Sequence, residues 1–351
     1  MKKLSLTALA LTNLLCLTTA CGDSSGDDTD GSTTASTPAT PATEPEPTTG
    51  TQPTDTTAET GNTTGAPADG PVCAHLGGID GVGELVGNFL GKVLANDKIN
   101  AYFLTSDTEF DTLPTCVINQ LGEATGCDGV TYGCRTMKAS HEGLGISQQD
   151  FDDFAADFIA AWDEHKATHP DVTDEDFTTV IGVLGGLAPE IVEDTANNAT
   201  VYQRVGRKPA IKGLIGEPGA AGSFVDNVAN DASINGFFGA TDFVRLNTCL
   251  TRQVHSLDGP NTYGKEIDPI GATDPGVSAA APCADMVSSH ANLVDANDGL
   301  GIEVADFSAL VGDLVTAMTD AGVTTDDQNI IAGILGPLCS SIVTVDPENC
   351  P

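Results

Sequence analysis

The stretch Met137-Lys138-Ala139-Ser140-His141-Glu142-Gly143-Leu144-Gly145-Ile146 decides the fold, because its pattern returns later in the chain. A short helical run ends in His141, and a Gly-Leu-Gly break follows it. The second copy is Met286-Val287-Ser288-Ser289-His290, with Gly299-Leu300-Gly301-Ile302 a little later. Each histidine comes four residues after a methionine and seven after a cysteine. An internal repeat of this kind indicates duplicated structural units, and it singles out the two histidines as candidate functional residues.

The rest of the chain repeats in the same order, with spacings that change only in loop-like stretches. Cys249 follows Cys116 by 133 residues (249 − 116), whereas His290 follows His141 by 149 (290 − 141). The difference (149 − 133) predicts an insertion of 16 residues around 268–281, which is rich in Pro, Gly and Ala. Duplicated domains show this pattern, so the sequence predicts two of them in tandem.

Apolar residues recur at spacings of three and four, as on one face of an α-helix. Thr173-Asp174-Glu175-Asp176 resembles a helix start. Few runs alternate with period two, so the sequence predicts an all-α fold with helices that include residues 82–93, 112–124, 150–163 and 177–187.

The N-terminus resembles an export signal. Lys2 and Lys3 precede an apolar run, and small residues lead to Cys21. This order is similar to a bacterial lipoprotein signal with Cys21 as the lipidated residue; a simple cleaved secretory signal is the alternative. The following Thr/Pro/Asp-rich segment has too few apolar residues to offset its ordering entropy. The predicted organisation is a signal peptide (1–20), a disordered tether (21–70) and two domains (71–196 and 197–351).

The charge balance excludes some partners. The chain has 14 Lys and Arg against 50 Asp and Glu, a net charge of −36. Nucleic acids and anionic membrane surfaces require a basic face, so we expect neither as a partner and expect membrane contact only through a lipid anchor. The predicted location is outside a bacterial cell, lipid-anchored at the periplasmic or outer surface, or secreted.

Eight cysteines follow Cys21, and an even number in an exported chain indicates disulfides. Eight cysteines allow 105 connectivities. The repeat narrows them, because Cys116 and Cys134 recur as Cys249 and Cys283. Thiolate ligation of a metal is the alternative. The predicted pairs are Cys116–Cys134, Cys249–Cys283, Cys73–Cys127 and Cys339–Cys350.

Residues 72–194 resemble a group I truncated haemoglobin, a shortened globin with a two-over-two helical sandwich. The motifs that carry the resemblance are Leu76-Gly77-Gly78, Asn88–Ala95, Asn100-Ala101-Tyr102-Phe103, Ala124-Thr125-Gly126, Tyr132-Gly133 and Met137–Ile146. Residues 201–343 resemble the same family less closely. They open with Val201-Tyr202-Gln203-Arg204-Val205-Gly206, but Arg207 replaces the second glycine.

The resemblance implies one haem b per domain, with His141 and His290 as proximal ligands of the iron. It also implies that other residues surround the haem: Phe89, Leu90, Tyr102, Phe103, Leu113, Val117 and Met137 in the first domain, and Phe224, Val225, Phe237, Phe238, Leu246, Leu250 and Met286 in the second.

The distal side departs from the family pattern. The family usually has tyrosine where Leu90 and Val225 stand, and often glutamine where Val117 and Leu250 stand. Those side chains donate hydrogen bonds to bound O₂. Losing such a donor costs on the order of 1–3 kcal/mol. The sequence therefore predicts weak O₂ binding and relatively better binding of CO and NO.

The implied function is binding of a small diatomic gas (O₂, NO or CO). One alternative is a degenerate globin scaffold that serves as a surface interaction module. Another is haem capture and relay, and a redox or haem-exchange partner is left open. No side chain stands out as a general acid or base, so no catalytic residue is assigned, although haem redox or NO chemistry is compatible.

The remaining sites have ordinary interpretations. A lone histidine at a helix end is more often structural than a ligand, but two at matching positions favour ligation for His141 and His290. The other four histidines show no convincing partner in the sequence, and we expect surface or structural roles for them: His75, His165, His169 and His255. Residues 294–298 resemble a calcium loop, but their spacing does not fit an EF-hand.

Overall fold

The computed structural model describes residues 68–104, 110–261, 263–265 and 274–351. The predicted signal peptide, Cys21 and the tether up to residue 67 lie outside these residues. In the described ranges there is no strand beyond two isolated bridges, which confirms the predicted all-α class. No helix in them is long and apolar enough to cross a membrane.

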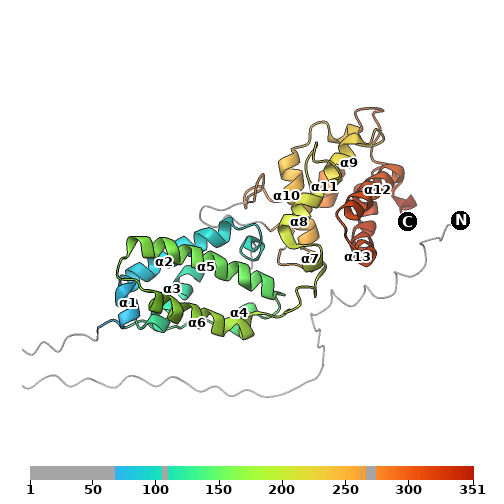
Figure 1. Ribbon diagram of the computed structural model, residues 1–351. Helices are drawn as coiled ribbons and strands as arrows, with labels where there is room; N and C mark the ends of the chain where they lie inside the picture. The colour runs from blue at the N-terminus through green and yellow to red at the C-terminus, as the bar shows by residue number, and fades with distance from the viewer. Residues whose placement is uncertain (1–67, 105–109, 262, 266–273) are drawn as a thin grey trace, which may run out of the picture. The chain divides into compact units, whose positions relative to one another are not determined.

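The helices fall into two sets with separate hydrophobic cores (Figure 1). The N-terminal half contains α1 (Pro71–His75), α2 (Gly78–Ala95), η1 (Asn100–Tyr102), α3 (Leu113–Thr125), α4 (Met137–His141), α5 (Gln148–Thr168) and α6 (Asp174–Ile191). The C-terminal half contains α7 (Val201–Arg204), α8 (Arg207–Ile215), α9 (Phe224–Asn230), η2 (Asn235–Phe238), α10 (Phe243–His255), α11 (Met286–His290), α12 (Val304–Asp320), α13 (Thr325–Leu335), η3 (Gly336–Leu338), α14 (Cys339–Ile342) and η4 (Pro347–Asn349).

Aromatic packing between α2 and α5 organises the N-terminal core. The ring of Phe89 contacts those of Phe154 and Phe158 edge to face, with centroids 4.8 and 5.3 Å apart. Phe158 and Trp162 are also buried. Burying a large apolar side chain stabilises the fold by roughly 1.5–3 kcal/mol. The residues that gave the predicted helical periodicity are therefore those that join the two helices.

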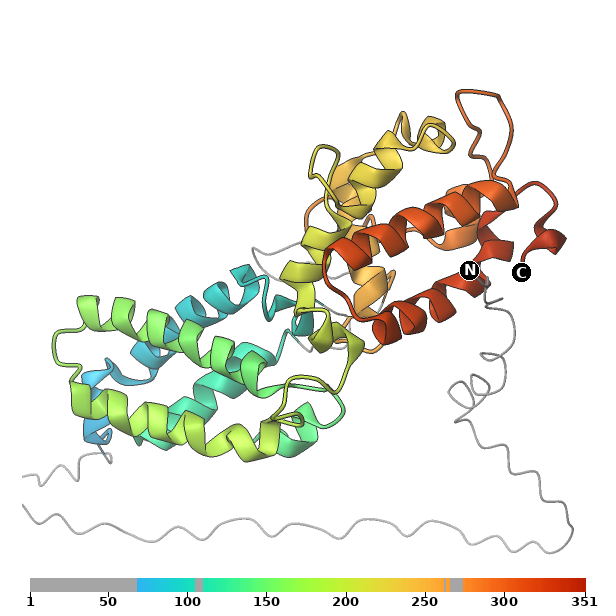
Figure 2. The same cartoon turned by 45° about the vertical axis from the view of Figure 1, so that its right-hand side comes forward.

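The C-terminal half repeats the arrangement of the last two helices. α5 and α6 lie side by side, and so do α12 and α13 (Figure 2). The segments that flank the first pair are joined by a hydrogen bond: the carbonyl of Ile146, before α5, accepts from the backbone N–H of Glu193, after α6 (2.8 Å). The same contact recurs in the second half, where the carbonyl of Ile302, before α12, accepts from the N–H of Thr344, after α14 (2.9 Å). The sequence repeat is thus matched by a repeated backbone contact.

A contact between a basic side chain and an aspartate recurs between α1 and α6 in the first half and between α7 and α13 in the second. His75 Nδ1 lies 3.0 Å from Asp176, and Arg204 Nη2 lies 2.7 Å from Asp327. Each aspartate is also the third residue of its helix and accepts from the N-cap threonine. A buried N-terminal aspartate therefore caps its own helix and holds the first helix against it.

The counterpart of α2 is broken in the C-terminal half, which the sequence did not predict. α8 ends at Gly216 (φ 65°), where a Cβ would lie only 2.1 Å from Ser223 Oγ. The side-chain amide of Asn247 donates to the carbonyls of Lys212 and Gly216 at 3.1 and 2.8 Å. These bonds satisfy carbonyls at the end of α8, so the break between α8 and α9 is stabilised from α10.

Arg207 has a left-handed backbone conformation, and the residue at the equivalent position of the N-terminal half, Gly78, is a glycine. Gly77 and Gly78 have φ values of 93° and 71°, and Arg207 has 64°. This region costs a non-glycine residue on the order of 1–3 kcal/mol. The buried guanidinium is held by Asp150 at 2.8 Å and Asp153 at 2.7 Å. Burial alone would raise the pKa of Asp153, but hydrogen bonds from Lys98 and Arg207 lower it below its ordinary value.

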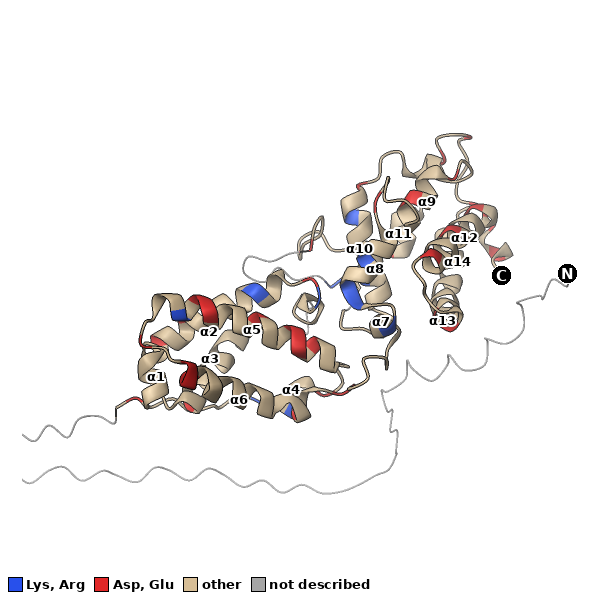
Figure 3. Cartoon of the chain, viewed as in Figure 1, with Lys and Arg blue, Asp and Glu red and all other residues tan. Residues whose placement is uncertain are grey.

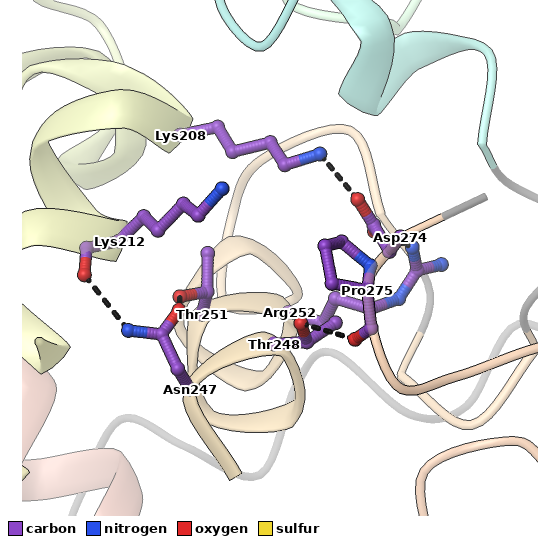
Figure 4. Close-up of a pocket in the computed structure, with 8 residues that line it drawn as sticks. All are labelled: Lys208, Lys212, Asn247, Thr248, Thr251, Arg252, Asp274 and Pro275. Carbon is purple, nitrogen blue, oxygen red and sulfur yellow. Dashed lines mark hydrogen bonds and ion pairs between the residues drawn. The ribbon is translucent and has the colours of Figure 1, made fainter. Parts of the chain in front are cut away.

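A buried ionic cluster consists of Lys208, Arg252 and Asp274 (Figure 4). Asp274 accepts from Lys208 Nζ at 2.5 Å and from Arg252 Nη1 at 2.6 Å. Figure 3 shows basic residues on α7 and α8 of this otherwise acidic chain. Asp274 comes from the predicted 16-residue insertion, so the insertion supplies the carboxylate that neutralises cations on α8 and α10.

Four disulfides join the cysteines in the predicted pairs, two of them from the repeat and two from the cysteines that remained: Cys73–Cys127, Cys116–Cys134, Cys249–Cys283 and Cys339–Cys350. The second and third connect α3 and α10 to the segments that lead into α4 and α11. Each therefore fixes the start of a histidine-bearing helix relative to a long helix.

Removing one of these links should lower stability measurably. Cys116→Ser/Cys134→Ser opens a link with a sequence separation of 18, which stabilises by roughly 3 kcal/mol through the entropy of the unfolded chain. We expect the midpoint of urea unfolding to fall accordingly. Cys339→Ser/Cys350→Ser opens a shorter link, with a separation of 11, and serves as the comparison. We expect its unfolding midpoint to fall slightly less. An unchanged midpoint in the first variant would contradict the prediction.

Candidate functional site

His141 is the last residue of α4 and is half-buried. Its Nδ1 lies 2.7 Å from the carbonyl oxygen of Met137. A carbonyl only accepts, so Nδ1 carries the proton and Nε2 of the neutral ring keeps its lone pair. In metal-binding histidines, the ring nitrogen that does not bind the metal commonly donates a hydrogen bond of this kind, which orients the ring. Thr136 caps the short helix by accepting from the N–H of Ala139.

His290 repeats this geometry on α11. Its Nδ1 lies 2.7 Å from the carbonyl oxygen of Met286, and the ring is again half-buried. Asp285 caps this helix by accepting from the N–H of Ser288 at 2.9 Å. In the residues that the structure describes, no hydrogen-bond partner is recorded for Nε2 of either histidine. Both rings thus offer one fixed, basic nitrogen.

The predicted distal residues all lie within the hydrophobic cores. Leu90 and Val225 are buried. The others are half-buried and pack against the same clusters: Leu113, Val117, Leu246 and Leu250. All six carry alkyl side chains, so these positions supply no hydrogen-bond donor.

The predicted aromatic contacts are arranged less uniformly. Phe89 is buried among core rings, while Phe103 is half-buried and stacks on Phe154 with 6.4 Å between centroids. The hydroxyl of Tyr102 donates to Asp150 at 2.9 Å. Burial, followed by the charge of Asp150, raises the pKa of Tyr102. Its hydroxyl is therefore engaged at the start of α5.

The three predicted aromatic residues of the C-terminal half also differ in how far they are buried. Phe224 is buried, whereas Phe237 and Phe238 on η2 are half-buried and pack against the core. A larger share of the ring surface is thus accessible on η2 than on α9.

An open groove of about 330 Å³ borders α11. Ligand pockets commonly measure about 300–1,000 Å³. Its apolar walls come from Leu257 after α10 and from residues of α11, α13 and η3, and Met286 lies one helical turn before His290. Gln253 Nε2 lies 3.9 Å from Met286 Sδ. The lining residues are Gln253, Ser256, Leu257, Tyr263, Met286, Ile334, Leu335 and Leu338.

The remaining histidines differ from the prediction that none has a partner. His75 pairs with Asp176, as described above. His255 is buried against Asn261, and burial lowers its pKa to about 3. His165 and His169 lie together with Glu84. The spacing of four residues between these two histidines, at the end of a predicted helix, was the signal that could have identified them.

Asp295 and Asp298, in the stretch weighed as a calcium loop, instead accept hydrogen bonds from backbone N–H groups of Asn297 and Leu300 at 2.6 and 2.8 Å. These carboxylates stabilise turns of the loop after α11.

Comparison with known proteins gives a partial likeness. No family model matches the chain. Group 1 truncated hemoglobin GlbN of Mycolicibacterium paratuberculosis is 26% identical over 153 residues, which are 42% of this chain and 88% of that protein. Two solved mutants of truncated hemoglobin from Tetrahymena pyriformis, both in the Fe(III) form, are 21% identical. They have TM-scores of 0.31 and 0.30 and cover 35% and 34% of this chain and 97% of each of theirs. At these values, the assignment of a site depends on the chain's own geometry.

Proposed function

We propose that this chain is a haem-binding protein with two tandem truncated-globin domains, which binds small diatomic gases. One observation carries the proposal. His141 and His290 share the same hydrogen bond from Nδ1 to a carbonyl four residues earlier, at 2.7 Å in both, which leaves Nε2 of each ring as the nitrogen that can bind iron. The similarity to a group 1 truncated hemoglobin supports the family.

The residues present fit haem b. Each histidine provides one oriented nitrogen, and half-buried apolar residues on α3 and α10 provide surface for a porphyrin. Bound haem supplies an iron that can take a diatomic gas. The chain's own part is to hold the imidazole in one tautomer and to keep the distal side apolar.

The four disulfides support an exported location, since such bonds persist in oxidising compartments. Cys21 as a lipid anchor is part of the same proposal. Its test is labelling with a radioactive fatty acid and comparison with Cys21→Ala. Absence of label from the wild-type chain would leave a secreted protein.

Haem titration of the full, oxidised chain tests the main proposal. We expect a Soret band that saturates at two equivalents of haem. Saturation at one equivalent would restrict the function to one half, and no Soret band would contradict haem binding.

The apolar distal side predicts fast release of O₂. Leu90→Tyr introduces a hydroxyl that can donate to bound O₂, which stabilises a polar ligand by on the order of 1–3 kcal/mol. We therefore expect O₂ dissociation from the N-terminal half to slow by roughly ten- to a hundredfold, measured by stopped flow. Leu90→Phe is the matched control for ring size and should not slow it. If O₂ dissociates from the wild-type chain as slowly as from Leu90→Tyr, the prediction is wrong.

A surface interaction module is the second candidate function, favoured by exposed apolar side chains that lie near His290 in the sequence. Val287, Val294 and Leu300 are 59%, 54% and 50% exposed. Exposed apolar residues mark interaction sites where they form a contiguous patch. If the titration gives no haem at His290, this surface becomes the leading functional candidate of the C-terminal half.

A further inference from the structure

Three potential metal ligands meet in the N-terminal half, away from α4. Glu84 on α2, His165 in the last turn of α5 and His169, the residue that follows α5, each place one ligand atom within 4.8 Å of the others. The two histidines are four residues apart in the sequence, and their rings stack. Glu84 is exposed, His169 is half-buried and His165 is buried. The cluster therefore has one fixed member and two that can adjust.

His165 is oriented as metal-binding histidines are. Its Nε2 lies 3.1 Å from the carbonyl oxygen of Leu76, so Nε2 carries the proton and Nδ1 has the lone pair. Nδ1 is buried and has no hydrogen-bond partner among the described residues. A buried nitrogen without a partner is costly. Gly81 makes the orientation possible, because a Cβ there would lie 1.8 Å from the Leu76 oxygen.

His169 is oriented in the same way. Its Nδ1 lies 3.2 Å from the carbonyl oxygen of His165 and therefore carries the proton. Its Nε2 lies 4.0 Å from Glu84 Oε2. Each imidazole thus has one nitrogen that donates to a backbone carbonyl and one nitrogen whose lone pair is left for an ion.

We propose that Glu84, His165 and His169 bind a divalent transition-metal ion, with Zn²⁺ as the best fit. Two imidazoles and a carboxylate are zinc ligands, and three protein ligands leave a fourth position for water. The carbonyl partners of the two rings provide the outer hydrogen bonds that tune such ligands. The net charge of −36 favours a cation.

Binding requires a small contraction. Tetrahedral Zn²⁺ with bonds of about 2.0–2.1 Å brings ligand atoms to about 3.4 Å from one another. The two rings now stack, with 3.9 Å between centroids and 14° between planes. A turn of the half-buried His169 ring and a rotation of the exposed Glu84 side chain would shorten the distances between the ligand atoms.

The cluster is a property of the N-terminal half alone. The spacing of the capping residues (Ser147 to Glu303, 156 residues) places Ala321 opposite His165 and Thr325 opposite His169. The spacing between Gly77 and Gly206 (129 residues) places Gly213 opposite Glu84. The site is therefore separate from the repeated histidines and from the proposed haem function.

Zn²⁺ titration of the metal-free full chain, in competition with a chromogenic chelator, tests the proposal. We expect one equivalent to bind with micromolar or tighter affinity. Glu84→Gln and His169→Ala should each weaken it by at least about tenfold. Glu164→Gln removes an exposed carboxylate from the same helix as His165 and is the matched control; it should leave the affinity unchanged. Co²⁺ in place of Zn²⁺ should give the visible absorption of a tetrahedral site.

Absence of Zn²⁺ binding would overturn the proposal. So would binding that persists in both Glu84→Gln and His169→Ala, because that result would place the ion at another site such as His141 or His290. Since both test variants are at half-buried or exposed positions, their thermal unfolding without metal should match that of the wild-type chain.

Discussion

His141→Ala and His290→Ala should each lower the haem bound by the chain from two equivalents to one, and the double variant should bind none. The single axial nitrogen is the only covalent link that a globin-type site offers to the haem iron. Each ring is held by its own carbonyl contact at 2.7 Å, so loss of one should not disturb the other. The measurement is Soret absorbance per chain after removal of free haem.

Two controls separate ligation from folding. His75→Ala removes a half-exposed histidine that pairs with Asp176 and should leave both haems in place. Imidazole added to His141→Ala should restore part of the Soret band, because a free imidazole can replace the missing side chain. If His141→Ala keeps two haems, His141 is not the proximal ligand; if His290→Ala keeps the same haem content as the wild type, the C-terminal half binds none through that residue.

Asp274→Asn should destabilise the chain by roughly 3–5 kcal/mol at pH 7, because it leaves the buried cations Lys208 and Arg252 without their shared carboxylate. Lys208 would keep its contact with Asn100 at 2.8 Å and a more distant one with Asp97 at 3.6 Å. Neither contact replaces the Asp274 carboxylate, which lies 2.5 Å from Lys208 Nζ. The measurement is urea unfolding followed by circular dichroism.

The effect of this substitution should depend on pH. Burial alone would raise the pKa of Asp274, but the charges of Lys208 and Arg252 lower it below its ordinary value. A carboxyl with a lowered folded pKa contributes stability that is present above its unfolded pKa of about 3.9 and lost as pH falls through the folded pKa. The difference between the wild type and Asp274→Asn should therefore be constant near neutral pH and shrink in acid.

Asp163→Asn is the matched control for this pair of measurements. Asp163 is an exposed carboxylate on α5, so its replacement should change stability by no more than about 0.5 kcal/mol. A difference between the wild type and Asp274→Asn that does not change with pH would contradict a role for the charge of Asp274.

The all-α class and the main helices were predictable, because the buried faces of α2 and α5 have clear three- and four-residue periodicity. The break between α8 and α9 was not. It depends on Asn247, which donates to the carbonyls of Lys212 and Gly216, 35 and 31 residues away in the chain. No local pattern carries such a contact.

For the candidate site residues, too, the sequence predicted some features and missed others. The histidine geometry repeats where the sequence repeats, and the roles of His141 and His290 as haem ligands stay predictions. Tyr102 donates its hydroxyl to Asp150, a contact across 48 residues that spacing alone does not give. His165 and His169 needed Glu84 from another helix before they could be considered together. Long-range partners, rather than residue type, limited the prediction in each of these cases.

The order of the cysteines along the chain bears on survival after proteolysis. Cys73–Cys127 and Cys116–Cys134 overlap, because residue 116 lies before 127 and residue 134 after it. A protease that cuts once anywhere between residues 73 and 134 therefore leaves the two fragments covalently joined. Cys249–Cys283 does the same for a cut between residues 249 and 283. A single cut within either of these two stretches therefore releases no helix from the chain.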